Sequence, residues 1–126
     1  MINNEYINSI LRLKYDKLDN NFSKDELDNV DSIVIFGDKC SINDIKLLTG
    51  LKSITLVDFD LFTDDIYYLF SLNLDSISFK ECSFDMVDHI KYISCNSISF
   101  INCDVIDYSF IYNMSNLTEL CIVNSD

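Results

Sequence analysis

The sequence predicts an α/β solenoid with about five parallel strands on a concave face and short helices on a convex face. A block of apolar residues at offsets 0, 3, 5, 8 and 10 recurs along the chain. Its copies begin at Val30, Leu51, Leu74, Cys95 and Leu117, so successive starts are 21, 23, 21 and 22 residues apart. Self-similarity at a fixed period of this length is typical of stacked repeats. Each copy also changes from strand-like to helix-like spacing.

The five copies differ in how well they keep the pattern: it is clearest in Leu74–Phe84, Cys95–Val105 and Leu51–Leu61, looser in Val30–Cys40 and broken in Leu117–Asp126. One short apolar run would be weak support for a repeat, but four near-copies in one register are strong support. We therefore divide the chain into residues 1–29 and a repeat region of residues 30–126.

The block resembles the leucine-rich repeat, whose pattern is L-x-x-L-x-L-x-x-N/C-x-L. Leu74, Ile77 and Phe79 match the three leucines, Cys82 matches the Asn/Cys position, and Phe84 matches the last leucine. The resemblance covers roughly three quarters of the chain. It implies a stack of strands and helices with an extended surface for binding other proteins.

The first two copies depart from this pattern. Asp38 and Phe59 stand where the family has Asn or Cys. The first copy can also be read with one or two extra residues after Ile35. We therefore expect an irregular first turn within the same architecture.

Apolar residues at offsets 3 and 5 alternate with mostly small or polar ones, which predicts a half-buried strand in each copy. The second half of each repeat has helical spacing. The residues expected to face the core there are Ile42, Ile45 and Leu48, then Val87 or Met86 with Ile90 and Ile93, then Ile106, Phe110 and Met114. One strand and one helical turn cannot bury their apolar sides alone, so the copies must stack.

Residues 1–29 are predicted to form a helical cap on the first strand. An amphipathic helix is expected over about residues 4–17. The apolar residues that predict it are Ile7, Ile10, Leu11 and Leu18. A short strand through Leu11, Leu13 and Tyr15 is the alternative. Ser23 and Glu26 are spaced as a capping box that opens a second short helix.

The other end has no such cap, because the fifth strand at Leu117, Leu120 and Ile122 is followed only by a few residues. An open apolar strand edge favours pairing with another strand. Three explanations remain open: the edge forms a homodimer, Asn124 and Asp126 blunt it, or the native chain continues.

Length and charge narrow the function. A chain of 126 residues is typical of one domain, and it contains no apolar run near the ~20 residues that span a bilayer. Since Met1–Asn20 is too polar for a secretory signal, we expect a cytoplasmic protein. The net charge of −12 disfavours direct binding of nucleic acid and favours a protein partner with a basic surface.

Motifs for catalysis are lacking. His89 is the only histidine, and the sequence has neither a glycine-rich phosphate loop nor a histidine-based zinc pattern. We therefore expect no enzyme activity, metal or cofactor. Cys82 and Cys103 occupy equivalent turns and are interpreted as part of a ladder of buried thiols, whereas Cys121 is the thiol expected to be accessible.

The outward strand positions are predicted to form rows that cross the repeats. The informative row contains Phe36, Val57, Lys80, Ile101 and Val123, four of them apolar at positions that should face solvent. Asp58, Glu81 and Asp104 are expected to line up beside it as an acidic ridge, with Asn102 in the same turns. An apolar stripe flanked by acids is typical of a partner-binding patch.

The most specific hypothesis is a small acidic inhibitor that docks on a basic surface of a nucleic-acid-handling protein. In size and charge the chain is similar to phage-type nuclease inhibitors, including anti-CRISPR proteins, which would imply an RNA-guided nuclease as the partner. A recognition module from a larger bacterial repertoire and a self-assembling structural protein are the alternatives.

Overall fold

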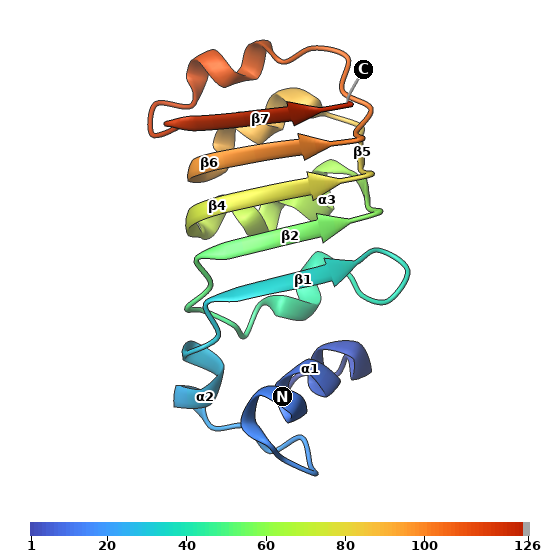
Figure 1. Ribbon diagram of the computed structural model, residues 1–126, viewed down its shortest axis with the longest axis vertical. Coiled ribbons are helices and arrows are strands. Elements are labelled where there is room, and N and C mark those ends of the chain that lie inside the picture. Colours follow the sequence, from blue (N-terminus) through green and yellow to red (C-terminus); the bar gives the residue numbers. More distant parts are fainter. Residues whose placement is uncertain (125–126) are drawn as a thin grey trace.

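The computed structural model describes residues 1–124, apart from the side chain of Thr63. Within this range the chain has an α/β fold in which five parallel strands form one sheet in the order β1-β2-β4-β6-β7 (Figure 1). The strands are β1 Ser32–Phe36, β2 Ser53–Val57, β4 Asn73–Lys80, β6 Ser94–Ile101 and β7 Glu119–Val123. The parallel sheet is as the sequence predicts. The suggested role of Asp126 lies outside the described residues.

Short helices lie behind one face of this sheet and leave its other face open (Figure 1). They are η1 Ile42–Ile45, α3 Thr63–Ile66, η2 Tyr67–Ser71, η3 Val87–Tyr92 and η4 Ser109–Asn113. A small parallel pair, β3 Asp60–Leu61 and β5 Ser83–Phe84, follows the ends of β2 and β4. We call the uncovered side the open face.

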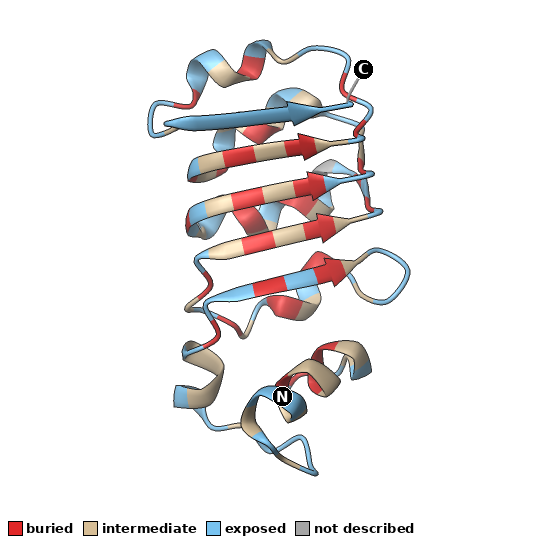
Figure 2. Cartoon of the chain, in the orientation of Figure 1, coloured by how far each residue is buried: buried red, intermediate tan, exposed pale blue. Residues whose placement is uncertain are grey.

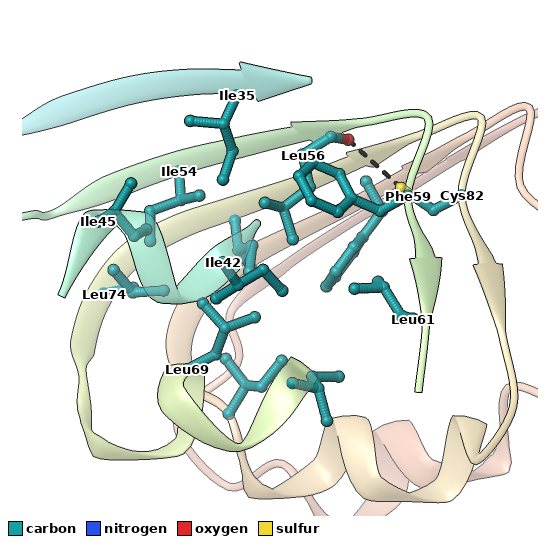
Figure 3. Close-up of a cluster of buried hydrophobic side chains, with 14 of the residues drawn as sticks. Ile35, Ile42, Ile45, Ile54, Leu56, Phe59, Leu61, Leu69, Leu74 and Cys82 are labelled. Atoms are coloured by element: carbon teal, nitrogen blue, oxygen red, sulfur yellow. Dashed lines mark hydrogen bonds between the residues drawn. The ribbon is translucent and has the colours of Figure 1, made fainter. Parts of the chain in front are cut away.

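The register of the five strands aligns their outward-facing residues in the rows that the sequence predicts. On the inner face, one row contains Ile33, Ile54, Ile77, Ile98 and Leu120, and the next contains Ile35, Leu56, Phe79, Phe100 and Ile122. In the first four strands these residues are 0–5% exposed. Figure 3 shows several of them packed against Leu69 of η2 and Ile42 and Ile45 of η1. The rings of Phe79 and Phe100 stack with their centroids 5.4 Å apart.

One predicted core position on the helical side is wrong, and one open alternative is decided. Ile106 is 95% exposed, because the helix of that repeat begins only at Ser109. Val87, not Met86, packs against the core. The other predicted residues of these helices are buried, from Ile42 to Met114.

The N-terminal segment forms the two predicted helices. α1 spans Glu5–Tyr15 and excludes the alternative strand, and α2 spans Lys24–Asp28 with both hydrogen bonds of the Ser23–Glu26 capping box. Ile7 and Leu11 are fully buried. Leu18, by contrast, is fully exposed, because α1 ends at Tyr15. In Figure 1, α1 lies beside β1 at one end of the sheet.

At the other end of the sheet, the described residues place no further strand beside β7. All five residues of β7 are exposed, and the strand is pale blue along its whole length in Figure 2. Leu120 and Ile122 are 45% and 40% exposed although they continue the two inner rows. The apolar edge strand predicted from the sequence is therefore present.

Candidate protein-binding face

The open face carries three rows of side chains across the sheet. The first is Ser32, Ser53, Ser76, Ser97 and Glu119, and the second is Val34, Thr55, Ser78, Ser99 and Cys121. The third is the predicted row Phe36, Val57, Lys80, Ile101 and Val123. Serine dominates the first two rows in the middle strands, so a partner can approach the sheet closely there.

The third row is half exposed and apolar except at Lys80. Val57 and Ile101 are partly exposed, and Val123 is 41% exposed. Lys80 is exposed between Val57 and Ile101. The row therefore presents aliphatic side chains with one cation among them, and we call it the apolar stripe.

The first member of this stripe is partly covered by α1. The ring of Tyr6 packs edge-on against Phe36, with 5.9 Å between centroids. The hydroxyl of Tyr6 donates a hydrogen bond of 3.1 Å to the carbonyl of Val34. Phe36 is nevertheless partly exposed, as Val57 and Ile101 are, so α1 bounds the apolar stripe at this end.

A groove lies between α1 and the open face. It has a volume of about 320 Å³, and its walls are Tyr6 and Ile10 on one side and Ser32, Val34, Ser53 and Thr55 on the other. The sequence reasoning placed α1 over the end of the sheet and missed this groove. A signal was available, because Tyr6 and Ile10 form an i, i+4 pair beside the buried pair Ile7 and Leu11.

Each of the last four strands of the main sheet ends in a left-handed turn residue. These residues are Asp58, Glu81, Asn102 and Asn124, with φ between 50° and 59°. The first three are held by backbone hydrogen bonds of 2.9 Å to the next strand, such as Asp58 N–H to the carbonyl of Lys80. Gly37 follows β1 at the equivalent position. A Cβ on Gly37 would come within 2.0 Å of the carbonyl oxygen of Asp58, so only glycine fits there.

The predicted acidic ridge is two rows rather than one. Asp58, Glu81 and Asn102 occupy equivalent turns. Asp104 lies two residues further along, where it bridges to Ser83, and Ser83 in turn pairs with Asp60. The Ser83 hydroxyl donates a 2.5 Å hydrogen bond to a carboxylate oxygen of Asp60. Asp104 therefore contributes to the same edge of the sheet, but not to the same row.

A shallow hollow on this edge gathers further carboxylates. Asp58, Asp60 and Asp65 line it, above Phe59 and beside Cys40. Among residues 1–124, no three His, Cys, Asp or Glu side chains are placed to hold a metal ion. The hollow adds negative charge next to the apolar stripe.

Three of the five thiols are buried, and Cys40 is partly buried. Cys82 and Cys103 are 2% and 3% exposed, and the interaction between their side chains lowers the pKa of Cys103 and raises the pKa of Cys82. Burial raises the pKa of Cys95 to about 11. Figure 3 shows the thiol of Cys82 pointing to the carbonyl of Leu56, at 3.4 Å. Cys121 is exposed, as predicted.

Comparison of the sequence with protein-family models and with curated proteins gave no match.

His89 lies on η3 beside the ring of Tyr92, with 5.8 Å between centroids. In the described part of the chain, no helix is both long and apolar enough to cross a membrane. The open face, with its partly exposed apolar stripe, is the candidate site that the geometry supports.

Proposed function

We propose that the chain is a leucine-rich-repeat-type solenoid that acts as a non-enzymatic protein–protein interaction module. The repeated side-chain environments support this architecture. Val30, Leu51, Leu74 and Cys95, which begin successive copies, are each 3% exposed. Cys82 and Cys103 donate equivalent hydrogen bonds to Leu56 and Phe79 of the preceding repeats.

The observation that carries the function is the apolar stripe beside the acidic edge. Val57, Ile101 and Val123 keep aliphatic surface half exposed, where alternation would place polar residues. Asp58 and Glu81 follow the stripe at once and are exposed. An apolar centre with a charged rim is the usual anatomy of a protein interface.

The net charge of the chain favours a partner protein with a basic surface. The chain carries −12, so a cationic surface would attract it over long distances at low salt. Proteins that handle nucleic acid have such surfaces, and an RNA-guided nuclease holds its duplexes in a positively charged channel. On this proposal the chain binds such a surface and blocks the guide RNA or the target nucleic acid from the nuclease. It would do so in the cytoplasm and would need no metal or cofactor.

The left-handed backbone conformation of Glu81 independently supports a binding role for the edge beside the apolar stripe. A residue with a Cβ in the left-handed region costs about 1–2 kcal/mol, and Asn bears this cost better than Glu. The turn after β6 uses Asn102 at the same place. Backbone strain of this kind clusters at functional sites, where the side chain itself is needed.

The test is capture of partners on immobilised protein from a bacterial lysate, followed by mass spectrometry and by binding assays with the purified partner. The baits are the wild type, a Val57→Asp, Ile101→Asp double variant, and Ile106→Asp as the matched control. Ile106 is 95% exposed and is not one of the open-face residues, so its replacement adds one negative charge away from the apolar stripe, where the double variant adds two on it. Circular dichroism verifies that all three are folded.

We expect a basic nucleic-acid-handling protein to bind the wild type and the Ile106→Asp control, and to lose at least ten-fold in affinity with the double variant. Raising the salt concentration from about 50 to about 300 mM should also weaken the complex of the wild type with its basic partner. Equal binding to all three baits would exclude the apolar stripe as the interface. A partner whose affinity does not respond to salt would exclude the basic-surface part of the proposal.

A further inference from the structure

The edge of β7 is a second surface with its own chemistry. In the described part of the chain, β7 pairs with β6 alone, and it ends the order of the five-stranded sheet. Beside it, Ile111 and Tyr112 of η4 form a hollow with the inward-facing Leu120 and Ile122. Tyr112 is 92% exposed. The edge thus combines backbone groups for pairing with apolar side chains on its inner side.

The backbone groups that face this edge follow from the pairing with β6. Asn102 donates its N–H to the carbonyl of Val123 at 2.9 Å. Because the direction of backbone groups alternates along a strand, residues 119, 121 and 123 face β6. Leu120 and Ile122 consequently direct their N–H and C=O groups away from the sheet.

We propose that a second copy of this chain docks on this edge, with the two β7 strands antiparallel about a two-fold axis at Cys121. This is the only two-fold register that pairs all five residues from Glu119 to Val123. It places Leu120 opposite Ile122 of the other copy, and both have edge-facing backbone groups, so they exchange hydrogen bonds. The two sheets then continue as one.

Within the paired strands this register keeps like charges apart, although each hollow beside β7 is also lined by Asp107. Glu119 is the only ionised residue of β7, and it lies opposite Val123 of the other copy rather than opposite another acid. On the inner side, the axis brings the two hollows together, so Leu120, Ile122 and the η4 side chains cover one another. A C2 contact of this kind uses the same patch twice and closes as a dimer.

The geometry makes a specific cross-linking prediction. Cys121 meets its own copy as a non-hydrogen-bonded pair, with the Cα atoms about 4.5 Å apart and the side chains on the open face. Diamide, a thiol oxidant, should therefore link Cys121 to Cys121 across the dimer. Mass spectrometry of peptides identifies the link, and Cys121→Ser should abolish it.

Two further variants test the register in the Cys121→Ser background. Glu119→Cys mixed with Val123→Cys should cross-link, because these positions face each other across the axis. Val123→Cys alone should not, since its two copies lie four residues, or about 13 Å, apart. Self-linking of Val123→Cys would overturn the register, and failure of every pair would overturn the dimer.

Sedimentation experiments measure the association itself. We expect Ile122→Asp to weaken the dimer at least ten-fold without unfolding the monomer, and Ile106→Asp to leave it intact. Added salt should strengthen the dimer, because it screens the repulsion between two acidic chains. Capture of a basic partner should weaken with salt, so the two proposals fail separately. A chain that stays monomeric up to about 100 μM would overturn the dimer.

Discussion

The two ends of the sheet contain the same pattern in different environments. At the first end, β1 buries Ile33 and Ile35 to 5% and 0% exposure. At the other end, the equivalent Leu120 and Ile122 of β7 remain 45% and 40% exposed. The first strand has α1 beside it, whereas the last pairs with no described strand other than β6. The residue pattern within one repeat therefore specifies a strand, but the element packed against that strand determines how far its apolar side chains are buried.

This difference has an energetic consequence. A repeat cannot bury both sides of its own core, so each inner row is shared between neighbouring units. The N-terminal helices supply the neighbour for β1, and they also occupy its backbone edge through Tyr6. β7 keeps both its apolar side chains and its edge for another strand.

The largest expected effect comes from truncating the same row at its two ends. Ile35→Ala should lower the free energy of unfolding by about 2–5 kcal/mol, because it leaves a cavity among buried side chains. Ile122→Ala should cost about 1 kcal/mol or less, because its side chain is already 40% exposed. Urea denaturation at low protein concentration measures both values on the monomer. Equal losses would show that the two ends are equally packed and would break the comparison.

A smaller effect is expected from the tyrosines at the two ends. Tyr6→Ala should cost about 1–3 kcal/mol, because it removes the ring contact with Phe36 and the hydrogen bond to Val34. Tyr112→Ala should change stability by no more than about 0.5 kcal/mol, since Tyr112 is 92% exposed. Tyr6→Phe separates the two contributions, because it keeps the ring and removes the hydroxyl. A Tyr112 variant that matches Tyr6→Ala would contradict the view that only the first end is covered.

The sequence predicted the regular part of the fold well. The rows through Ser32, Val34 and Phe36 follow from the period-two alternation and from a nearly constant repeat length. The alternation and the repeat length constrain every strand, so an ambiguous register in one repeat is resolved by the other repeats. The capping box at Ser23 was predictable for a local reason, since its two hydrogen bonds join residues three apart.

The errors fall where the repeat gives no constraint. Ile106 was assigned to the core although a loop precedes its helix, and Asp104 was placed in a row two residues away from its own. The cover over Phe36 depends on how α1 is oriented, which helical periodicity alone does not determine. The candidate site was therefore predicted as a set of strand positions, but its boundary was not.

The smallest expected effect concerns the turns after β4 and β6. Glu81→Asn should stabilise the protein by about 0.5–1 kcal/mol, because Asn adopts the left-handed conformation at a lower cost, as Asn102 does one repeat later. Thermal and urea unfolding measure the gain. Glu81→Gln is the matched control, because it removes the charge without relieving the backbone.

These two variants separate strain from charge. Both should weaken the capture of a basic partner, because each removes a carboxylate next to the apolar stripe. Only Glu81→Asn should gain stability. If Glu81→Asn gained stability and bound the partner as well as the wild type does, the strained glutamate would have no role in recognition. If it lost stability, the carboxylate would contribute to the fold itself, and the strain could no longer be taken as a mark of the binding face.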